Sequence, residues 1–235
     1  MSLAGKNPQD TWGAVWYAQH VTSYLPSWTL RVYIDNSTEK NQVPGAVINK
    51  LVLLGAQVMI IPEEMRSLPS EVWRYLVIDD ETVDVFLIRD TRTRFTEREA
   101  VILEKWIKNI AKNPIYCVRD HTDHSQLGIV EGLWGASHAQ LLQLIKLDQP
   151  SIVAGFYANK ERSTQTFLSD VICPQLGGRA SCFDSVSCSE WENSRPFPVL
   201  RVGGKWVGQP YSQYGMAQQS SESLPGASPN QCNNS

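Results

Sequence analysis

The segment from Val83 to Trp106 constrains the fold of this chain more than any other part of the sequence. Within it, Val85–Ile88 is an unbroken apolar run, which is typical of a parallel strand covered on both faces. Arg89 and Asp90 follow at the carboxyl end of the expected strand, where ligands of open α/β sheets bind. The Thr96–Glu99 segment has the spacing of a capping box and predicts the start of a helix. A charged loop is therefore expected on a rigid strand–helix frame.

Strand-like and helix-like segments alternate along most of the chain. The expected strands cover 30–34, 57–61, 85–88 and 115–119, and the expected helices cover 14–24, 44–54, 70–77, 96–110, 137–147 and 165–172. This order predicts an α/β protein with a mostly parallel sheet and helices on both of its faces. Near the end, Leu200–Val202 and Lys205–Val207 flank two glycines and predict a small hairpin. Residues 1–210 are expected to form one domain, and 211–235 a polar, extended tail.

Composition excludes several classes of protein. A net charge of −3 argues against a general nucleic-acid-binding protein. No apolar run approaches the ~20 residues that a membrane-spanning helix needs. The five cysteines lack C-x-x-C spacing, so they predict neither a zinc ribbon nor a disulfide framework. A soluble protein in a reducing intracellular compartment is favoured, with Cys117 as a small buried apolar residue.

The charged loop also belongs to a longer series of motifs. Its own members are Arg89, Asp90, Arg94, Arg98, Glu99 and Trp106. The series continues on both sides with 2–14, 28–33, 118–121 (Val-Arg-Asp-His), 133–135 (Leu-Trp-Gly), 196–198 (Pro-Phe-Pro), Arg201 and 207–209 (Val-Gly-Gln). This ordered set resembles a family of glycosyltransferase-like proteins with a GT-A-type nucleotide-diphospho-sugar transferase fold. Compared with that family, most of the first strand is missing, so a truncated first strand is expected.

The resemblance implies where a nucleotide-sugar donor would bind. The implied donor-binding residues are Arg89, Asp90, Arg92, Arg94, Arg119, His121, Trp134 and Gly135. Asp184 is the first candidate for a catalytic or sugar-contacting carboxylate, and Asp120 is the second. Asp184 is equally well explained as a turn or cap residue beside Ser185. The arginines around Arg92 also fit a solvated face that pairs with nearby glutamates.

Departures from the family pattern remove ligand chemistry. Where the family has a D-x-D motif for a divalent metal, this chain has Asp90, Thr91 and Arg92, so a cation replaces the second acid. A family D-Q pair reads Thr164-Gln165, the His of an H-D-S element reads Phe183, and a loop Gly reads Glu131. No metal site is therefore expected. Mn²⁺ or Mg²⁺ would be a cofactor only if Asp90 still supports a metal site. The His121–His124 run could hold a transition metal, but residues that orient loops are the favoured interpretation, because H-x-x-H on a loop is common by chance.

Two functions follow from these residues. The first is a glycosyltransferase-fold protein with weakened or lost metal-dependent catalysis, which acts as a structural or interaction subunit with protein partners. The alternative is an active, metal-independent glycosyltransferase, in which Arg92 replaces the metal and holds the diphosphate of a nucleotide sugar. A nucleotide-binding sensor without turnover is a third, related possibility.

Overall fold

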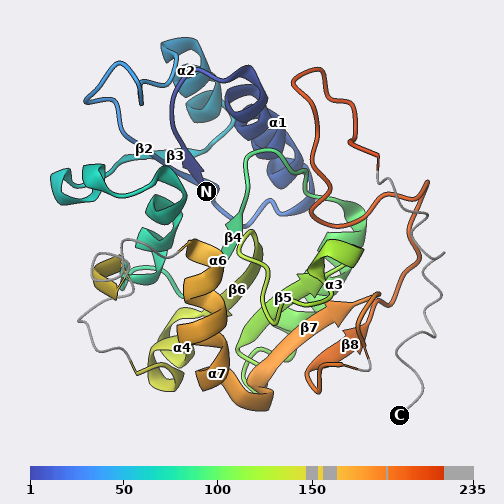
Figure 1. The fold of residues 1–235 in the computed structure, drawn as a ribbon. Coiled ribbons are helices and arrows are strands. Elements are labelled where there is room, and N and C mark those ends of the chain that lie inside the picture. Colours follow the sequence, from blue (N-terminus) through green and yellow to red (C-terminus); the bar gives the residue numbers. More distant parts are fainter. Residues whose placement is uncertain (147–152, 156–162, 189, 220–235) are drawn as a thin grey trace. The chain divides into compact units, whose positions relative to one another are not determined.

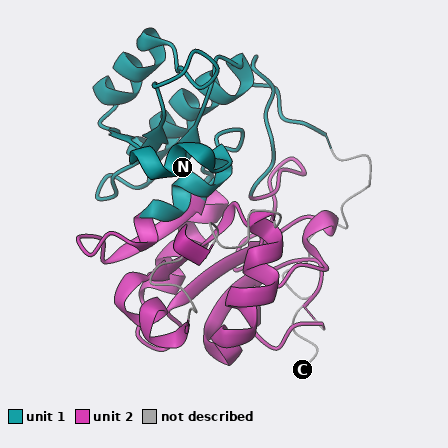
Figure 2. Cartoon of the chain, turned by 60° about the vertical axis from the view of Figure 1, so that its left-hand side comes forward, with its two compact units in different colours: residues 1–76, 89–96, 208–219 teal, residues 77–88, 97–207, 220–235 magenta. Residues whose placement is uncertain are grey.

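The computed structural model describes residues 1–146, 153–155, 163–188 and 190–219 of the chain (Figure 1). These residues divide into two compact units, coloured separately in Figure 2. The first unit contains 1–76, 89–96 and 208–219, and the described part of the second lies within 77–88 and 97–207. Each unit has its own sheet, so the predicted α/β class is confirmed, whereas the single predicted sheet is replaced by two.

The first unit is built on a small parallel sheet. Its elements are β1 (Ser2–Leu3), α1 (Pro8–Tyr24), β2 (Arg31–Ile34), α2 (Gly45–Leu53), β3 (Gln57–Ile60), the 3₁₀ helix η1 (Glu63–Ser67) and most of the 3₁₀ helix η2 (Ser70–Ile78). The strand order is β1-β2-β3, and both pairings are parallel. β1 contains two residues, which pair with the end of β2.

Local sequence explains why α1 begins and packs as it does. Asn7 accepts a hydrogen bond from the Gln9 N–H (3.0 Å) with its side-chain oxygen, and Pro8 occupies the first helical position. The helix buries an apolar face that includes Ala14 and Val21 against its unit. The start of α1 is therefore fixed by its own sequence, which matters because its first turn contributes to a pocket.

The second unit contains a mixed sheet. Its elements are β4 (Val85–Arg89, whose last residue belongs to the first unit), α3 (Glu97–Ile107), β5 (Ile115–Arg119), the 3₁₀ turn η3 (Thr122–His124), β6 (Leu133–Ser137), α4 (His138–Leu144), α6 (Thr164–Phe167), the π-helical turn η4 (Leu168–Ile172), α7 (Cys173–Leu176), the 3₁₀ turn η5 (Gly177–Arg179), β7 (Ala180–Asp184) and β8 (Ser194–Pro196). The strand order is β4-β6-β5-β7-β8. β5 pairs with β6 antiparallel and with β7 parallel, and every residue of β5 and β7 is buried.

Two expectations for the C-terminal part need correction. The hairpin around Gly203 and Gly204 is absent from the described structure, where these glycines with positive φ form only a turn. The predicted extended tail does not begin at 211, because 208–219 belongs to the first unit and Tyr211 forms an isolated bridge with Ala217. A Cβ atom on Gly215 would overlap the ring of Trp16. The segment 208–219, called the strap below, therefore packs closely on α1. The remainder of the predicted tail, 220–235, lies outside the described residues.

The cysteines also differ from expectation. Cys117 of β5 is fully buried, as predicted, but it is joined by a disulfide to Cys182, its register partner on β7. The two residues are 65 positions apart, so the pairing follows from the strand register and not from local spacing. Cys173 is a free thiol, and burial raises its pKa to about 11. No helix within the described residues is both long and apolar enough to cross a membrane.

Candidate functional site

Four of the predicted donor-binding residues lie in the first unit, and three of them line a pocket there. The pocket has a volume of about 280 Å³ and lies beside the carboxyl end of β1, the first turns of α1 and η2, and the loop that follows β4. Six charged residues line it: the arginines Arg74, Arg89 and Arg92, and the acids Asp10, Glu71 and Asp90. Arg74 and Arg89 are almost completely buried, so their charges are held in the pocket wall. Such a wall suits a polar, charged ligand.

Arg92 is held in the pocket by Asp10. The guanidinium donates from Nε to Oδ1 (2.6 Å) and from Nη2 to Oδ2 (3.0 Å) of the carboxylate, a bidentate ion pair. The Asp10 hydrogen bond is the main reason why the pKa of Arg92 is raised. The close approach depends on Gly13, where a Cβ atom would overlap the carbonyl oxygen of Thr91. Thr91 then donates its hydroxyl to Asp10 Oδ1 (3.2 Å), so helix and loop meet at this carboxylate.

Asp90 is the acid that the resemblance aligns with a metal motif, and a guanidinium lies beside it. Its Oδ1 accepts the backbone N–H of Arg92 (3.0 Å), and its Oδ2 lies 3.7 Å from Arg74 Nη1. Across the described ranges, no group of three or more His, Cys, Asp or Glu side chains is arranged to hold a metal ion. A carboxylate beside a buried guanidinium is a poor ligand for a divalent cation, so the residues present do not fit the metal that the resemblance implies.

Arg94, the fourth predicted residue of this unit, has a packing role. Its guanidinium lies between two rings, 4.7 Å from the centroid of Trp16 and 4.9 Å from that of Tyr211. It donates from Nη1 to the carbonyl oxygen of Thr93 (2.7 Å). Burial lowers the pKa of Arg94 to about 10. The side chain fastens the strap 208–219 to α1 and is absent from the pocket lining.

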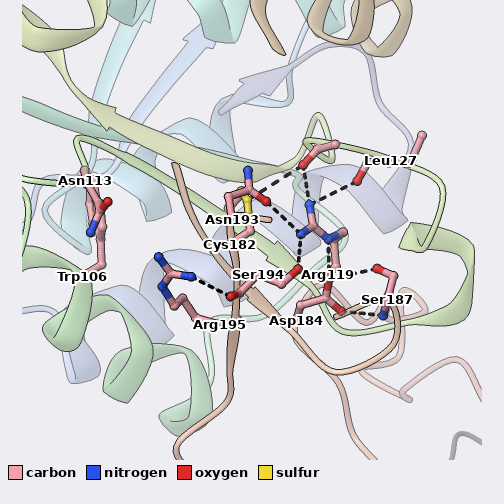
Figure 3. The surroundings of a disulfide bond; sticks show 12 residues. Trp106, Asn113, Arg119, Leu127, Cys182, Asp184, Ser187, Asn193, Ser194 and Arg195 are labelled. Atoms are coloured by element: carbon pink, nitrogen blue, oxygen red, sulfur yellow. Dashed lines mark hydrogen bonds and ion pairs between the residues drawn. A yellow bond between two sulfur atoms is a disulfide. The ribbon is translucent and has the colours of Figure 1, made fainter. Parts of the chain in front are cut away.

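In the second unit, Asp184 accepts a complete set of hydrogen bonds (Figure 3). Oδ1 accepts the N–H groups of Val186 and Ser187, both at 2.8 Å. Oδ2 accepts from Arg119 Nε (2.6 Å) and from the hydroxyls of Ser187 (2.9 Å) and Ser194 (3.0 Å). Burial alone would raise the pKa of Asp184, but these donors outweigh it, and the pKa is lowered. Asp184 is therefore held as a buried anion.

Arg119, a predicted donor-binding residue, is completely occupied by this network. Arg119 and Asp184 have no exposed side-chain surface. Besides Asp184, the Arg119 guanidinium donates to the Gly128 carbonyl oxygen (2.6 Å) and to the Ser194 hydroxyl (2.8 Å), and it lies over the ring of Trp191. Figure 3 shows Asp184 and Ser194 beside the Arg119 guanidinium. The arrangement joins β5, β7 and β8 and leaves no free guanidinium edge for a phosphate.

Asp120, the second catalytic candidate, is equally saturated. Arg98 donates to both carboxylate oxygens (3.1 and 3.0 Å), and Arg201 donates to Oδ1 and to the backbone carbonyl oxygen. The Ser185 hydroxyl (2.6 Å) and the Val207 N–H (2.9 Å) complete the set. The Asp120 side chain has no exposed surface. Asp120 is therefore a buried acceptor that binds Ser185, Arg201 and Val207 at the end of β5.

The His121–His124 run forms a compact turn. His121 accepts the Asp123 N–H with Nδ1 (3.2 Å), and its ring lies 4.6 Å from that of Trp206. His124 Nδ1 accepts the Asp120 N–H (3.3 Å). Burial, together with the nearby His121, lowers the pKa of His124 to about 4. These contacts match the loop-orienting interpretation.

Trp134 and Gly135, the last two predicted donor-binding residues, are buried in β6. Trp134 packs edge-on against Phe86 of β4, with 5.5 Å between ring centroids, and it has no exposed surface. A Cβ atom on Gly135 would overlap the Phe86 carbonyl oxygen and lie 2.6 Å from Leu87 Cδ2. The glycine thus allows β4 and β6 to approach each other, which is a packing role in place of the ligand contact implied by the resemblance.

Three residues that depart from the pattern implied by the resemblance have hydrogen-bond or packing partners within the protein: Glu131, Thr164 and Phe183. The Thr164 hydroxyl donates to the Glu131 carboxylate, and the Glu131 N–H donates to Gln165 Oε1 (3.0 Å). The hydroxyl of Thr164 therefore provides a hydrogen-bond donor for the carboxylate of Glu131. Phe183 is buried between the rings of Tyr116 and Phe197, each 6.2 Å away between centroids. An apolar ring fills the position where the family has a histidine.

Sequence reasoning missed the other half of the pocket lining. Asp10 lies before the 14–24 helix that the sequence predicts, whereas the structure places it in the first turn of α1, where the helix dipole stabilises an acid. Arg74 carries a detectable signal, since it is a lone cation within the apolar segment 72–78, which predicts a buried guanidinium. Glu71 carries no such signal. Comparison of the chain with models of known protein families, with curated proteins and with solved structures finds no match.

Proposed function

We propose that this chain is a glycosyltransferase-fold protein that has lost metal-dependent sugar transfer and serves as a non-catalytic, ligand-binding subunit of a larger assembly. The observation that carries the proposal is the pocket of the first unit, which is open but has a guanidinium beside its metal-motif acid, Asp90. Such a pocket favours the phosphates of a nucleotide sugar over a metal ion.

The charges at Asp90 can be weighed. A divalent cation about 3 Å from the carboxylate would gain about 11 kcal/mol at an effective dielectric constant of about 20. The Arg74 guanidinium, 3.7 Å from that carboxylate, would then lie about 5 Å from the ion and repel it by about 7 kcal/mol. More than half of the attraction is offset before dehydration of the ion is counted. A phosphate is repelled by Asp90, so it would lie toward the guanidinium groups of Arg74, Arg89 and Arg92, where it needs no metal to balance its charge.

The two catalytic candidates support the loss of transfer. Asp120 and Asp184 are buried, and each is bound by at least one arginine and several further donors. A general base must reach the proton of an acceptor, and a nucleophile must reach a sugar carbon. A carboxylate with all its lone pairs occupied and no exposed surface reaches neither. The arginine pairs instead stabilise the fold of the second unit.

Exposed apolar residues of the first unit support the subunit role. They are Val52 and Leu53 at the end of α2 and Met59 and Ile60 on β3, of which Leu53 is 81% exposed and Ile60 60%. β3 is the last strand of its sheet. Exposed apolar residues beside a sheet edge are typical of protein interaction surfaces.

The Cys117–Cys182 disulfide is more typical of oxidising compartments than of the reducing compartment favoured by the sequence, so we propose no reducing compartment for this protein.

Isothermal titration calorimetry tests the ligand half of the proposal. UDP, UDP-sugars and GDP-sugars are titrated into the protein with EDTA and, separately, with Mn²⁺. We expect binding of at least one nucleotide that EDTA leaves unchanged, without release of free sugar or nucleotide on incubation. Binding only with Mn²⁺, or turnover, contradicts the proposal. For the subunit half, native size-exclusion of the endogenous protein should show migration with a larger assembly, and migration as a monomer contradicts it.

The three guanidinium groups of the pocket also favour one alternative, a metal-independent transferase in which Arg92 stabilises the leaving diphosphate. Sugar transfer to an added acceptor in EDTA, abolished by Arg92→Gln, would establish this activity. The same assay with Asp184→Asn would show whether the buried carboxylate takes part.

A further inference from the structure

Arg92 already holds an anion, and that anion belongs to the protein. Nε and Nη2, which form one edge of its guanidinium, bind the two oxygens of Asp10 at 2.6 and 3.0 Å. Asp10 lies 82 residues earlier in the chain, and both residues line the pocket. A guanidinium binds phosphate oxygens through the same two-point geometry. The carboxylate therefore occupies the edge of Arg92 that a ligand phosphate would use.

The pair is well ordered by its surroundings but remains open to solvent. Thr91 donates to the carboxylate, and the packing of Thr91 on Gly13 fixes the distance between helix and loop. The side chains are 45% exposed for Arg92 and 21% for Asp10. Ion pairs with that exposure contribute little to stability and separate at low cost. A more highly charged anion that enters the pocket can therefore compete for Arg92.

We infer that Asp10 is an internal competitor of the ligand, and that binding of a diphosphate transfers Arg92 from Asp10 to the phosphate. This inference rests on the proposed function, because it assumes that the pocket binds a diphosphate. It assigns Asp10 the role of a specificity-determining residue: a ligand with a single carboxylate offers Arg92 nothing that Asp10 does not, whereas a diphosphate carries more charge. The Asp10 carboxylate also repels an anion in the pocket, most strongly once Arg92 no longer neutralises its charge.

Calorimetric titration with pyrophosphate and with UDP, both in EDTA, tests the competition. Asp10→Asn keeps the shape of the side chain but removes its charge. Glu71→Gln is the matched control, because Glu71 also lines the pocket and lies in the first turn of a helix, and no contact between it and Arg92 is described. We expect Asp10→Asn to bind both probes about fivefold more tightly, equivalent to about 1 kcal/mol, and Glu71→Gln to change affinity less than twofold.

The outcomes separate this inference from the proposed function. If the wild type binds and Asp10→Asn binds equally or more weakly, Asp10 positions Arg92 and the competition is refuted, although the proposed function stands. If no variant binds either probe, both are refuted. A crystal structure of the wild-type protein with pyrophosphate gives a readout that needs no substitution: an intact Asp10–Arg92 pair beside bound pyrophosphate would also refute the competition.

Discussion

Replacing Asp184 with asparagine should destabilise the second unit strongly. The variant keeps the size of the side chain but turns one acceptor oxygen into an NH₂ group that faces donors, and it leaves the Arg119 charge without a counterion. Both side chains are fully buried, so water cannot solvate the remaining charge. Breaking one partner out of a buried ion pair costs about 3–5 kcal/mol. That is a large share of the roughly 5–15 kcal/mol by which a domain is stable.

Urea unfolding at pH 7, followed by far-UV circular dichroism, measures this cost. Asp123→Asn is the control, because Asp123 is in the same unit and 85% exposed, and it should change the free energy of unfolding by less than about 0.5 kcal/mol. A loss below 1 kcal/mol for Asp184→Asn would refute the buried network as the role of this carboxylate. If Asp184→Asn abolished sugar transfer in the EDTA assay without loss of stability, Asp184 would be a catalytic residue.

The pH dependence gives a second test on the wild type. The pKa of Asp184 is lowered from its ordinary value of 3.8, so the carboxylate stabilises the fold when ionised. That contribution is complete well above pH 3.8. As the pH falls below this value, the unfolded chain takes up the proton first, and stability is lost until the pH reaches the lowered pKa of the folded state. Asp184→Asn should lack this part of the acid transition.

Three further predictions concern other residues. Gly135→Ala should cost about 1–3 kcal/mol of unfolding free energy by urea titration, because the added Cβ overlaps the Phe86 carbonyl oxygen. His124 should cost the fold on the order of 3 kcal/mol as the pH falls from 6.5 to about 4, because the unfolded chain binds a proton there that the folded state does not; His124→Asn should remove this loss in unfolding curves. Arg94→Lys should lose about 1 kcal/mol and release the strap, seen as faster amide hydrogen exchange at Tyr211, since an ammonium group cannot stack between two rings.

Periodic elements were predictable because their signals are local. The 14–24 helix pattern corresponds to α1, and the apolar run at 85–88 corresponds to β4, each within a few residues except at the start of α1. The helix starts at Pro8 because Asn7 caps it. The Asn7-Pro8 pair is a helix-start signal that lies outside the predicted range of 14–24. The glycine pair near 203 was misleading, because a turn signal shows where the chain reverses and not whether the flanking segments find strand partners.

The roles of the charged residues depend on information of a different physical kind. A motif shows that an acid follows a strand, but not how many donors the rest of the fold directs at it. Asp120 follows β5 and Asp184 ends β7, yet Arg201, which binds Asp120, lies 81 residues later, and Arg119, which binds Asp184, lies 65 residues earlier. Asp90 keeps an exposed side because the donors around it leave part of its carboxylate open to a pocket. Whether an acid binds a ligand or the protein itself is thus decided by long-range packing, which no local pattern encodes.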